Sequence, residues 1–197
     1  MKRLLTLLAL TTGFALLGGC AFAPSLGAYK VTAYKPHNPA NVKVKVSTST
    51  QNIYVMEGDR LLMAVQGNVG KADSPTPAGN FHITDKNKTK RRVSEPDAGY
   101  PMAYWCEFLP AYGLHEGFVW SIPRTHGCIR LHKEAAARLF ALVKVGTPVN
   151  ISTTQPEDAT VGKSVRRLDQ RNDPNPPTPL LMSPRYFQDP PGPLLID

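Results

Sequence analysis

The chain has 197 residues and a formal net charge of +8, from 23 lysines and arginines against 15 aspartates and glutamates. About 178 residues remain once the N-terminal leader described below is set aside, a length consistent with one domain. The basic surplus is moderate and spread along the chain, and nucleic acid is a poor match for an exported protein. Anionic wall polymer or lipid headgroups fit the surplus better through long-range attraction, although a solvated basic surface explains it equally well.

Residues 1–19 have the features of a cleaved secretory leader. Lys2 and Arg3 provide a positive start, and the apolar run Leu4–Leu17 follows them. That run is short for a membrane-spanning helix and ends in small residues, which is typical of a signal peptide. We therefore expect the mature protein to work outside the cytoplasm.

Cys20 completes a Leu-Gly-Gly-Cys sequence that resembles a bacterial lipobox. The resemblance implies cleavage before Cys20 and acylation of its sulfur and new amino terminus, and several acyl chains make a stable membrane anchor. Ala21 stands where an Asp usually retains lipoproteins at the inner membrane, so the resemblance favours the outer membrane, facing the periplasm. An ordinary leader with a chance cysteine is the alternative. Residues 20–40 are then a lipidated tether.

Short strand patterns begin at residue 42. Valines at 42, 44 and 46 alternate with lysines, which predicts a half-buried strand. Ile53–Met56 and Leu61–Val65 flank the turn sequence Glu-Gly-Asp-Arg and predict a hairpin. Further strands are expected at Phe81–Thr84 and Val149–Ile151.

One amphipathic helix is expected before the last strand. Ala136, Leu139, Phe140 and Val143 are spaced at i, i+3, i+4 and i+7, and Gly146 follows as a stop signal. The sequence therefore predicts a mainly β domain with one helix packed on it.

Residues 153–197 are rich in proline, especially at 173–179 and 189–193. Such a segment has few N–H donors and little apolar density, so we expect a largely disordered tail.

The segment Thr125–Arg130 reads Thr-His-Gly-Cys-Ile-Arg and carries the clearest chemistry. Cys128 and the upstream His115 are the minimum parts of a thiol nucleophile with its base. Gly127 removes side-chain bulk where a substrate carbonyl must reach the backbone N–H groups that stabilise an oxyanion.

This segment matches the [Ser/Thr]-His-Gly-Cys signature, and the chain thereby resembles the L,D-transpeptidase catalytic domain family (YkuD-like). Five more segments match in order: Ile53–Val65, Asp73–Gly79, Tyr100–Trp105, Tyr112–His115 and Gly146–Val149. The resemblance implies an L,D-transpeptidase-type β-sandwich with one packed helix over residues 41–152.

The resemblance implies an enzyme that acts on peptidoglycan stem peptides without a cofactor. Its cysteine attacks the carbonyl of the third stem residue, the terminal D-Ala leaves, and the resulting thioester passes its acyl group to an amine of another stem or of an envelope lipoprotein. A hydrolase on the same scaffold, a carboxypeptidase or endopeptidase, and a non-catalytic wall-binding lipoprotein are the alternatives. The short segment between His115 and Thr125 slightly favours water as acceptor.

Carried over to this chain, the resemblance makes Cys128 the nucleophile and His115 the general base and later the acid. The N–H groups of Gly127 and Cys128 are the implied oxyanion donors. The implied substrate-binding residues include Thr125 and His126, which shape the loop, and Arg130, whose guanidinium suits a carboxylate. Tyr104 and Trp105 are implied to line the donor groove.

Three further expectations concern the surroundings of Cys128. A protonated His115 would keep Cys128 partly ionised. Glu116 is expected to face water. Cys106 is either a buried free thiol or a disulfide partner of Cys128 in an oxidising compartment. A zinc site built from Cys128, His126, His132 and His115 is disfavoured, because the chain has no second compact Cys/His pair.

Overall fold

The computed structural model describes residues 29–95 and 97–197. The expected leader, the lipidation site Cys20 and the first part of the tether lie outside the described residues. Within the described part of the chain, no helix is long and apolar enough to cross a membrane.

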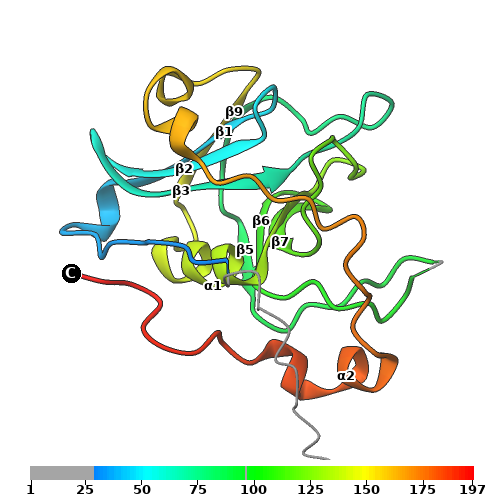
Figure 1. Cartoon of the computed structure of the whole chain (residues 1–197). Coiled ribbons are helices and arrows are strands. Elements are labelled where there is room, and N and C mark those ends of the chain that lie inside the picture. Colours follow the sequence, from blue (N-terminus) through cyan, green and yellow to red (C-terminus); the bar gives the residue numbers. More distant parts are fainter. Residues whose placement is uncertain (1–28, 96) are drawn as a thin grey trace, which may run out of the picture.

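The described strands form a single curled sheet in the order β4-β9-β1-β2-β3-β8-β7-β6-β5 (Figure 1). Two pairs are parallel, β1 with β9 and β7 with β8, and the other neighbours are antiparallel. The strands are β1 (Val42–Ser47), β2 (Asn52–Glu57), β3 (Arg60–Asn68), β4 (Gly79–His82), β5 (Asp85–Asn87), β6 (Trp105–Leu109), β7 (Tyr112–Glu116), β8 (Ile129–Leu131) and β9 (Pro148–Ser152).

The predicted alternation and hairpin are confirmed in β1, β2 and β3. The three valines at 42, 44 and 46 are at most 1% exposed, because one face of β1 packs on the core. The strands β2 and β3 pair antiparallel around a turn at which Gly58 has a φ of 59°, a conformation that glycine adopts without steric cost.

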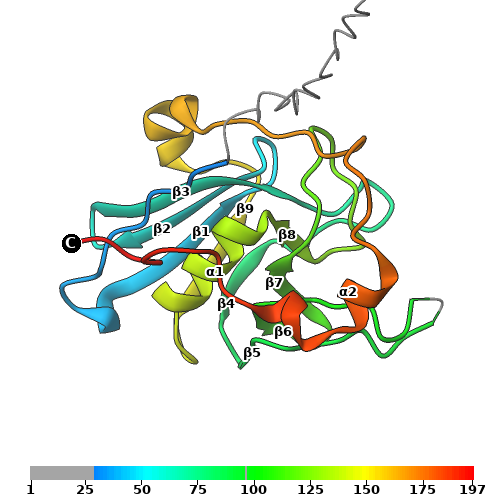
Figure 2. The same cartoon turned by 60° about the horizontal axis from the view of Figure 1, so that its bottom comes forward.

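Helix α1 (Lys133–Leu142) lies across the curl of the sheet and packs against β7 and β8 (Figure 2). Ala136, Leu139 and Val143 are buried, as the apolar spacing predicts, and Phe140 is partly buried against the core. The side chain of His132 accepts a hydrogen bond from the N–H of Glu134 and caps the first turn. At the other end, the Lys86 ammonium donates to the carbonyls of Phe140 and Val143 at 2.7 and 2.6 Å. The mainly β fold with one main helix is therefore confirmed.

The tail differs from the predicted disordered segment. It contains the 3-10 helices η2 (Pro156–Ala159), η3 (Val161–Ser164) and η4 (Pro184–Phe187) and the short helix α2 (Thr178–Met182). Figure 1 shows it, orange to red, passing around the domain and returning beside the blue N-terminal segment. There Ile196 forms a parallel bridge with Tyr34, and its N–H donates to the carbonyl of Ala33 at 2.9 Å.

The physical reason for this difference is the position of the prolines. Pro156 and Pro184 stand at the starts of η2 and η4, where a missing N–H costs nothing. Tyr186 and Phe187 then bury their rings in the main core, at 6% and 7% exposure. The apolar anchors were too sparse for the sequence pattern to indicate a docked segment.

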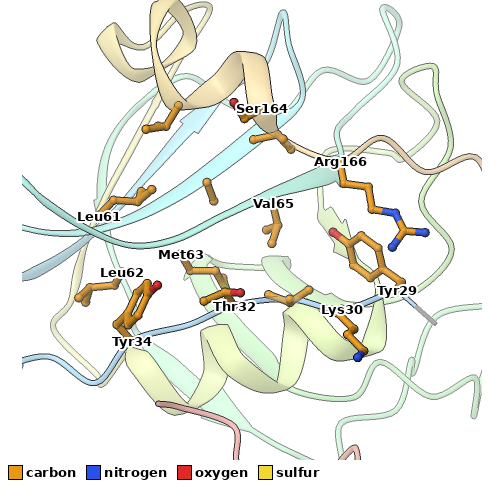
Figure 3. Close-up of a pocket in the computed structure, with 14 residues that line it drawn as sticks. Tyr29, Lys30, Thr32, Tyr34, Leu61, Leu62, Met63, Val65, Ser164 and Arg166 are labelled. Carbon is orange, nitrogen blue, oxygen red and sulfur yellow. The ribbon is translucent and has the colours of Figure 1, made fainter. Parts of the chain in front are cut away.

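A cavity of about 340 Å³ lies between residues 29–34, β3 and the segment 161–166 (Figure 3). Its labelled lining includes Tyr29, Tyr34 and Met63. Neither Cys128 nor His115 lines this cavity, so it is separate from the predicted catalytic site.

Candidate active site

The parallel pairing of β7 with β8 brings the two predicted catalytic residues into neighbouring parts of the fold. Leu114 pairs with Ile129, and both are fully buried on the core face. His115 pairs with Arg130, and Cys128 directly precedes β8. The Sγ of Cys128 donates to the carbonyl of Ala111 at 3.7 Å, and the sulfur accepts from the N–H of Gly113 in β7. The thiol therefore lies beside the start of the strand that carries His115.

The imidazole of His115 is held in the tautomer that a general base needs. Its Nδ1 lies 2.7 Å from the main-chain carbonyl oxygen of Glu116, which can only accept, so Nδ1 carries the proton. The other ring nitrogen, Nε2, is then the basic atom. Burial lowers the pKa of His115 to about 4, which keeps the imidazole neutral at neutral pH. The Trp105 ring, with its centroid 5.7 Å away, packs beside it.

Cys128 is half-buried, and this burial raises the pKa of its thiol above the ordinary value. The N–H of Gly113 and the guanidinium of Arg130 lower that pKa by smaller amounts. Burial therefore disfavours both the thiolate and the imidazolium, which is the opposite of the expected resting ion pair. These directions favour a neutral thiol and a neutral imidazole.

The loop before β8 is held by the hydroxyl of Thr125. This hydroxyl donates to the carbonyl of Cys128 at 2.6 Å and accepts from the N–H of Gly127 at 3.2 Å. Gly127 has a φ of 113°, and a Cβ there would lie 2.3 Å from the ring of Tyr112. Gly127 is thus required by its backbone conformation and by Tyr112, and its N–H is already used within the loop. The N–H of Cys128 remains the oxyanion-donor candidate.

Arg130 is half-buried, and its charge acts on the Cys128 thiol. Two further arginines, to which the sequence pattern gave no role, also contribute positive charge at this site. Arg92 and Arg130 both favour the thiolate of Cys128 electrostatically, and the charge of Arg124, whose guanidinium lies 4.7 Å from the Trp120 ring centroid, lowers the pKa of Arg130. By contrast, His126 of the signature is exposed. The only sequence signal for Arg92 was its place in a basic stretch, and Arg124 directly precedes the signature.

Neither aromatic residue predicted to line the donor groove is exposed. Tyr104 is 1% exposed, and its hydroxyl donates to the carboxylate of Asp189 in the tail at 2.9 Å. Trp105 is 3% exposed and packs on Gly113 as well as on His115. In this structure Tyr104 anchors the tail and Trp105 forms a wall of the His115 site.

Glu116 does not face water, contrary to the expectation. Its carboxylate accepts a hydrogen bond from the Tyr186 hydroxyl of the tail at 2.7 Å. Burial raises the pKa of the Glu116 carboxyl, and the bond from Tyr186 lowers it in part.

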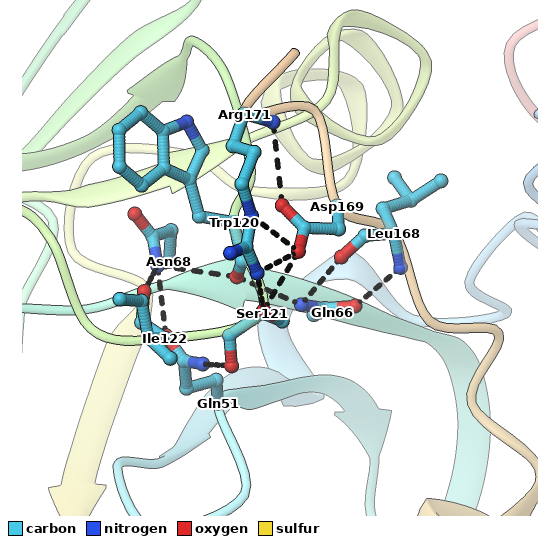
Figure 4. Close-up of polar contacts among 9 residues, drawn as sticks. All are labelled: Gln51, Gln66, Asn68, Trp120, Ser121, Ile122, Leu168, Asp169 and Arg171. Carbon is cyan, nitrogen blue, oxygen red and sulfur yellow. Dashed lines mark hydrogen bonds and ion pairs between the residues drawn. The ribbon is translucent and has the colours of Figure 1, made fainter.

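The short segment 117–124 beside the site is fixed by a polar network that the sequence analysis missed (Figure 4). Asn68 and Gln66, both from β3, donate to the carbonyls of Ile122 and Trp120 at 2.7 and 3.1 Å. From the other side, the hydroxyl of Ser121 donates to the carboxylate of Asp169 in the tail at 2.8 Å. The segment is therefore held between the sheet and the tail.

Cys106 is a fully buried free thiol on the core face of β6, opposite Leu114. Burial raises its pKa to about 12. Cys106 and Cys128 are both free thiols, so they form no disulfide with each other in this structure. Among the residues that the structure describes, no group of three His, Cys, Asp or Glu side chains could hold a metal ion.

Comparison with known proteins assigns the family. The L,D-transpeptidase catalytic domain (YkuD) model matches residues 41–151. The chain therefore belongs to the L,D-transpeptidase catalytic domain family.

A curated relative agrees with this assignment, and two solved structures share the fold. A YkuD protein of Bacillus licheniformis is 31% identical over 122 residues, which cover 58% of this chain and 69% of the relative. An L,D-transpeptidase structure from Stackebrandtia nassauensis superposes with a TM-score of 0.52 at 22% identity, over 63% of this chain and 60% of that one. The structure of the L,D-transpeptidase LdtMt1 in complex with imipenem gives a TM-score of 0.51 at 25% identity, over 57% and 59%. The chain thus spans about three fifths of these two solved chains.

Proposed function

We propose that this protein is a cysteine-dependent peptidoglycan L,D-transpeptidase in which Cys128 is the nucleophile and His115 the general base. The observation that carries the proposal is that the half-buried thiol of Cys128 lies against the start of β7, where its Sγ donates to the carbonyl of Ala111 at 3.7 Å, and that β7 also carries an imidazole whose Nδ1 is protonated. That tautomer leaves Nε2 ready to accept the thiol proton.

In the proposed first half-reaction, the sulfur of Cys128 attacks the carbonyl of the third stem residue while its proton passes to Nε2 of His115. The resulting oxyanion is stabilised by the N–H of Cys128. The C–N bond to the terminal D-Ala then breaks, the departing amine takes the proton from His115, and a thioester remains on Cys128.

In the second half-reaction, an amine of another stem or of an envelope lipoprotein attacks the thioester. His115 takes the amine proton and returns it to the sulfur as the new amide forms. The neutral resting pair suits this sequence, because each proton that leaves a reacting group has His115 as its acceptor.

The arginines beside the site support an anionic substrate. The charges of Arg130 and Arg92 both favour the Cys128 thiolate, and Arg92 also pairs with Asp97 at 3.3 Å. Stem peptides carry carboxylates, which a guanidinium binds through two parallel hydrogen bonds. In this proposal, Arg130 binds the substrate carboxylate nearest the scissile bond.

The proposed location is the periplasmic face of the outer membrane, with Cys20 as the lipid anchor. The support is the Leu-Gly-Gly-Cys sequence followed by Ala21. Labelling with a radioactive fatty acid tests the anchor, since the Cys20→Ala protein would carry no label.

The test of the reaction is incubation of purified tetrapeptide stems with the enzyme, followed by mass spectrometry. Joined dimers that require Cys128 support transfer. Shortened monomers without dimers would show that the enzyme is a hydrolase and not a transferase. Unchanged stems would favour the non-catalytic alternative. Imipenem provides a second probe, because it is the compound in the LdtMt1 complex. A covalent adduct is expected on the wild-type protein and not on Cys128→Ala.

A further inference from the structure

The C-terminal tail contacts the end of the strand that carries His115. In η4, Tyr186 is 6% exposed, and its hydroxyl donates to the carboxylate of Glu116 at 2.7 Å. The main-chain carbonyl of Tyr186 is itself bound by the ammonium of Lys133, at the start of α1, at 2.9 Å. The Arg91 guanidinium lies 5.0 Å from the ring centroid of Phe187 and fixes the next tail residue.

Glu116 connects this tail contact to the imidazole. Its N–H donates to the carbonyl of Ala103 at 2.8 Å, its carboxylate is bound by Tyr186, and its carbonyl accepts from Nδ1 of His115 at 2.7 Å. Since side chains alternate along β7, the Glu116 side chain lies on the face opposite the imidazole. The carboxylate therefore acts on His115 through the main chain of Glu116.

Two restraints act on the peptide whose carbonyl accepts the hydrogen bond from His115. Glu116 is the last residue of β7, and the N–H of Gly117, in the same peptide unit as the Glu116 carbonyl, donates to the carbonyl of Leu131 at 2.9 Å. The hydrogen bond from Tyr186 also fixes the Glu116 side chain, which further restricts rotation of this peptide. An imidazole that loses this acceptor can adopt the other tautomer or another ring orientation.

We propose that Tyr186 is a positioning residue for the catalytic base His115 and acts through Glu116. The inference rests on the proposed function for its effect on turnover. It adds a tail residue, outside the segment matched by the family model, to the active-site scaffold.

The first experiment compares the full-length wild-type protein with Tyr186→Phe, which removes only the hydroxyl. The expected result is a kcat for the transfer reaction that is lower by roughly 3- to 30-fold, with the donor KM unchanged within about twofold. This range lies below the roughly hundredfold loss that a 1 Å misplacement of a reacting group can cause. A change in KM alone, or no change in kcat, would overturn the inference.

The matched control is Asp189→Asn, which weakens another tail contact without touching Glu116. Asp189 accepts from the Tyr104 hydroxyl and pairs with Lys88 at 2.8 Å. This variant is expected to keep the wild-type kcat even if its melting temperature falls. An equal loss of kcat in Asp189→Asn would mean that general docking of the tail, and not Tyr186, is responsible.

The second readout is the ring ¹⁵N spectrum of His115, which needs no substrate. The wild type is expected to show one tautomer with the proton on Nδ1, and Tyr186→Phe a mixture of tautomers or a broadened Nδ1–H signal. An unchanged spectrum in Tyr186→Phe refutes the inference even if the protein proves to have another reaction. If Tyr186→Phe fails to fold, Glu116→Met, which removes the acceptor at similar length, is measured in its place, and a wild-type spectrum and kcat there would refute the inference.

Discussion

Gly127→Ala tests whether the loop before Cys128 is shaped by packing. Gly127 has a φ of 113°, which an L-residue rarely adopts, and the added Cβ would lie 2.3 Å from a ring atom of Tyr112. Gly146 offers a matched control, since its φ is 89° but nothing lies within 4 Å of a Cβ there. The two substitutions share the backbone cost and differ in the clash.

The expected magnitudes follow from these two costs. Placing an alanine in the left-handed region costs about 1–2 kcal/mol. Overpacking against a ring that is itself fixed costs about 1–3 kcal/mol more. Gly127→Ala is therefore expected to lower the free energy of unfolding by about 2–5 kcal/mol, and Gly146→Ala by about 1–2 kcal/mol.

The assay is urea unfolding at neutral pH, followed by tryptophan fluorescence. The free energies of the wild type and the two variants are compared only if all three proteins have the same m-value, the slope of the unfolding free energy against urea concentration. Transfer activity of Gly127→Ala should fall as well, because the added methyl group displaces the loop that holds the nucleophile. Equal destabilisation by the two substitutions would show that Tyr112 does not press on Gly127, and the packing account of this loop would be wrong.

Two further predictions concern the neutral resting pair. Cys128 should react with iodoacetamide faster than the buried Cys106, and its rate should still rise above pH 8, because burial raises the pKa of Cys128; a rate already level at pH 6 would indicate a preformed ion pair. In the folded protein the pKa of His115 is about 4, below the ordinary 6.5. Between these two pH values the imidazole is protonated in the unfolded chain but neutral in the folded one. The free energy of unfolding therefore falls as pH drops from 6.5 to 4. Across that pH range the free energy of unfolding of the wild type should fall by up to about 3 kcal/mol relative to that of His115→Gln. If the two proteins showed the same pH dependence of unfolding, the lowered pKa of His115 would be contradicted.

The sequence predicted those parts of the fold that local patterns encode. The alternating valines of β1, the hairpin of β2 and β3 and the apolar spacing of α1 all depend on neighbouring residues. The signature around Cys128 likewise lies in one short segment, and the resemblance supplied His115.

The contacts that the sequence did not predict join residues far apart in the chain. The bond between Tyr186 and Glu116 spans 70 positions, and the one between Tyr104 and Asp189 spans 85. The tail was misjudged because its proline content outweighed two aromatic anchors. The expectation that Glu116 faces water failed for the same reason, since its partner comes from that tail.

Protonation states were also beyond the sequence. A cysteine and a histidine in one motif predict a reactive pair, but whether the pair is charged depends on burial. Burial lowers the pKa of His115 and raises that of Cys128, and neither shift can be read from the residue types.

The most direct test of the account is to trap the acyl-enzyme with a tetrapeptide stem and map it by mass spectrometry of the digested protein. The account predicts an added mass equal to the donor without its terminal alanine, on the peptide that contains Cys128, and no adduct on Cys128→Ala. An adduct on another residue, or full transfer activity in Cys128→Ala, would contradict it.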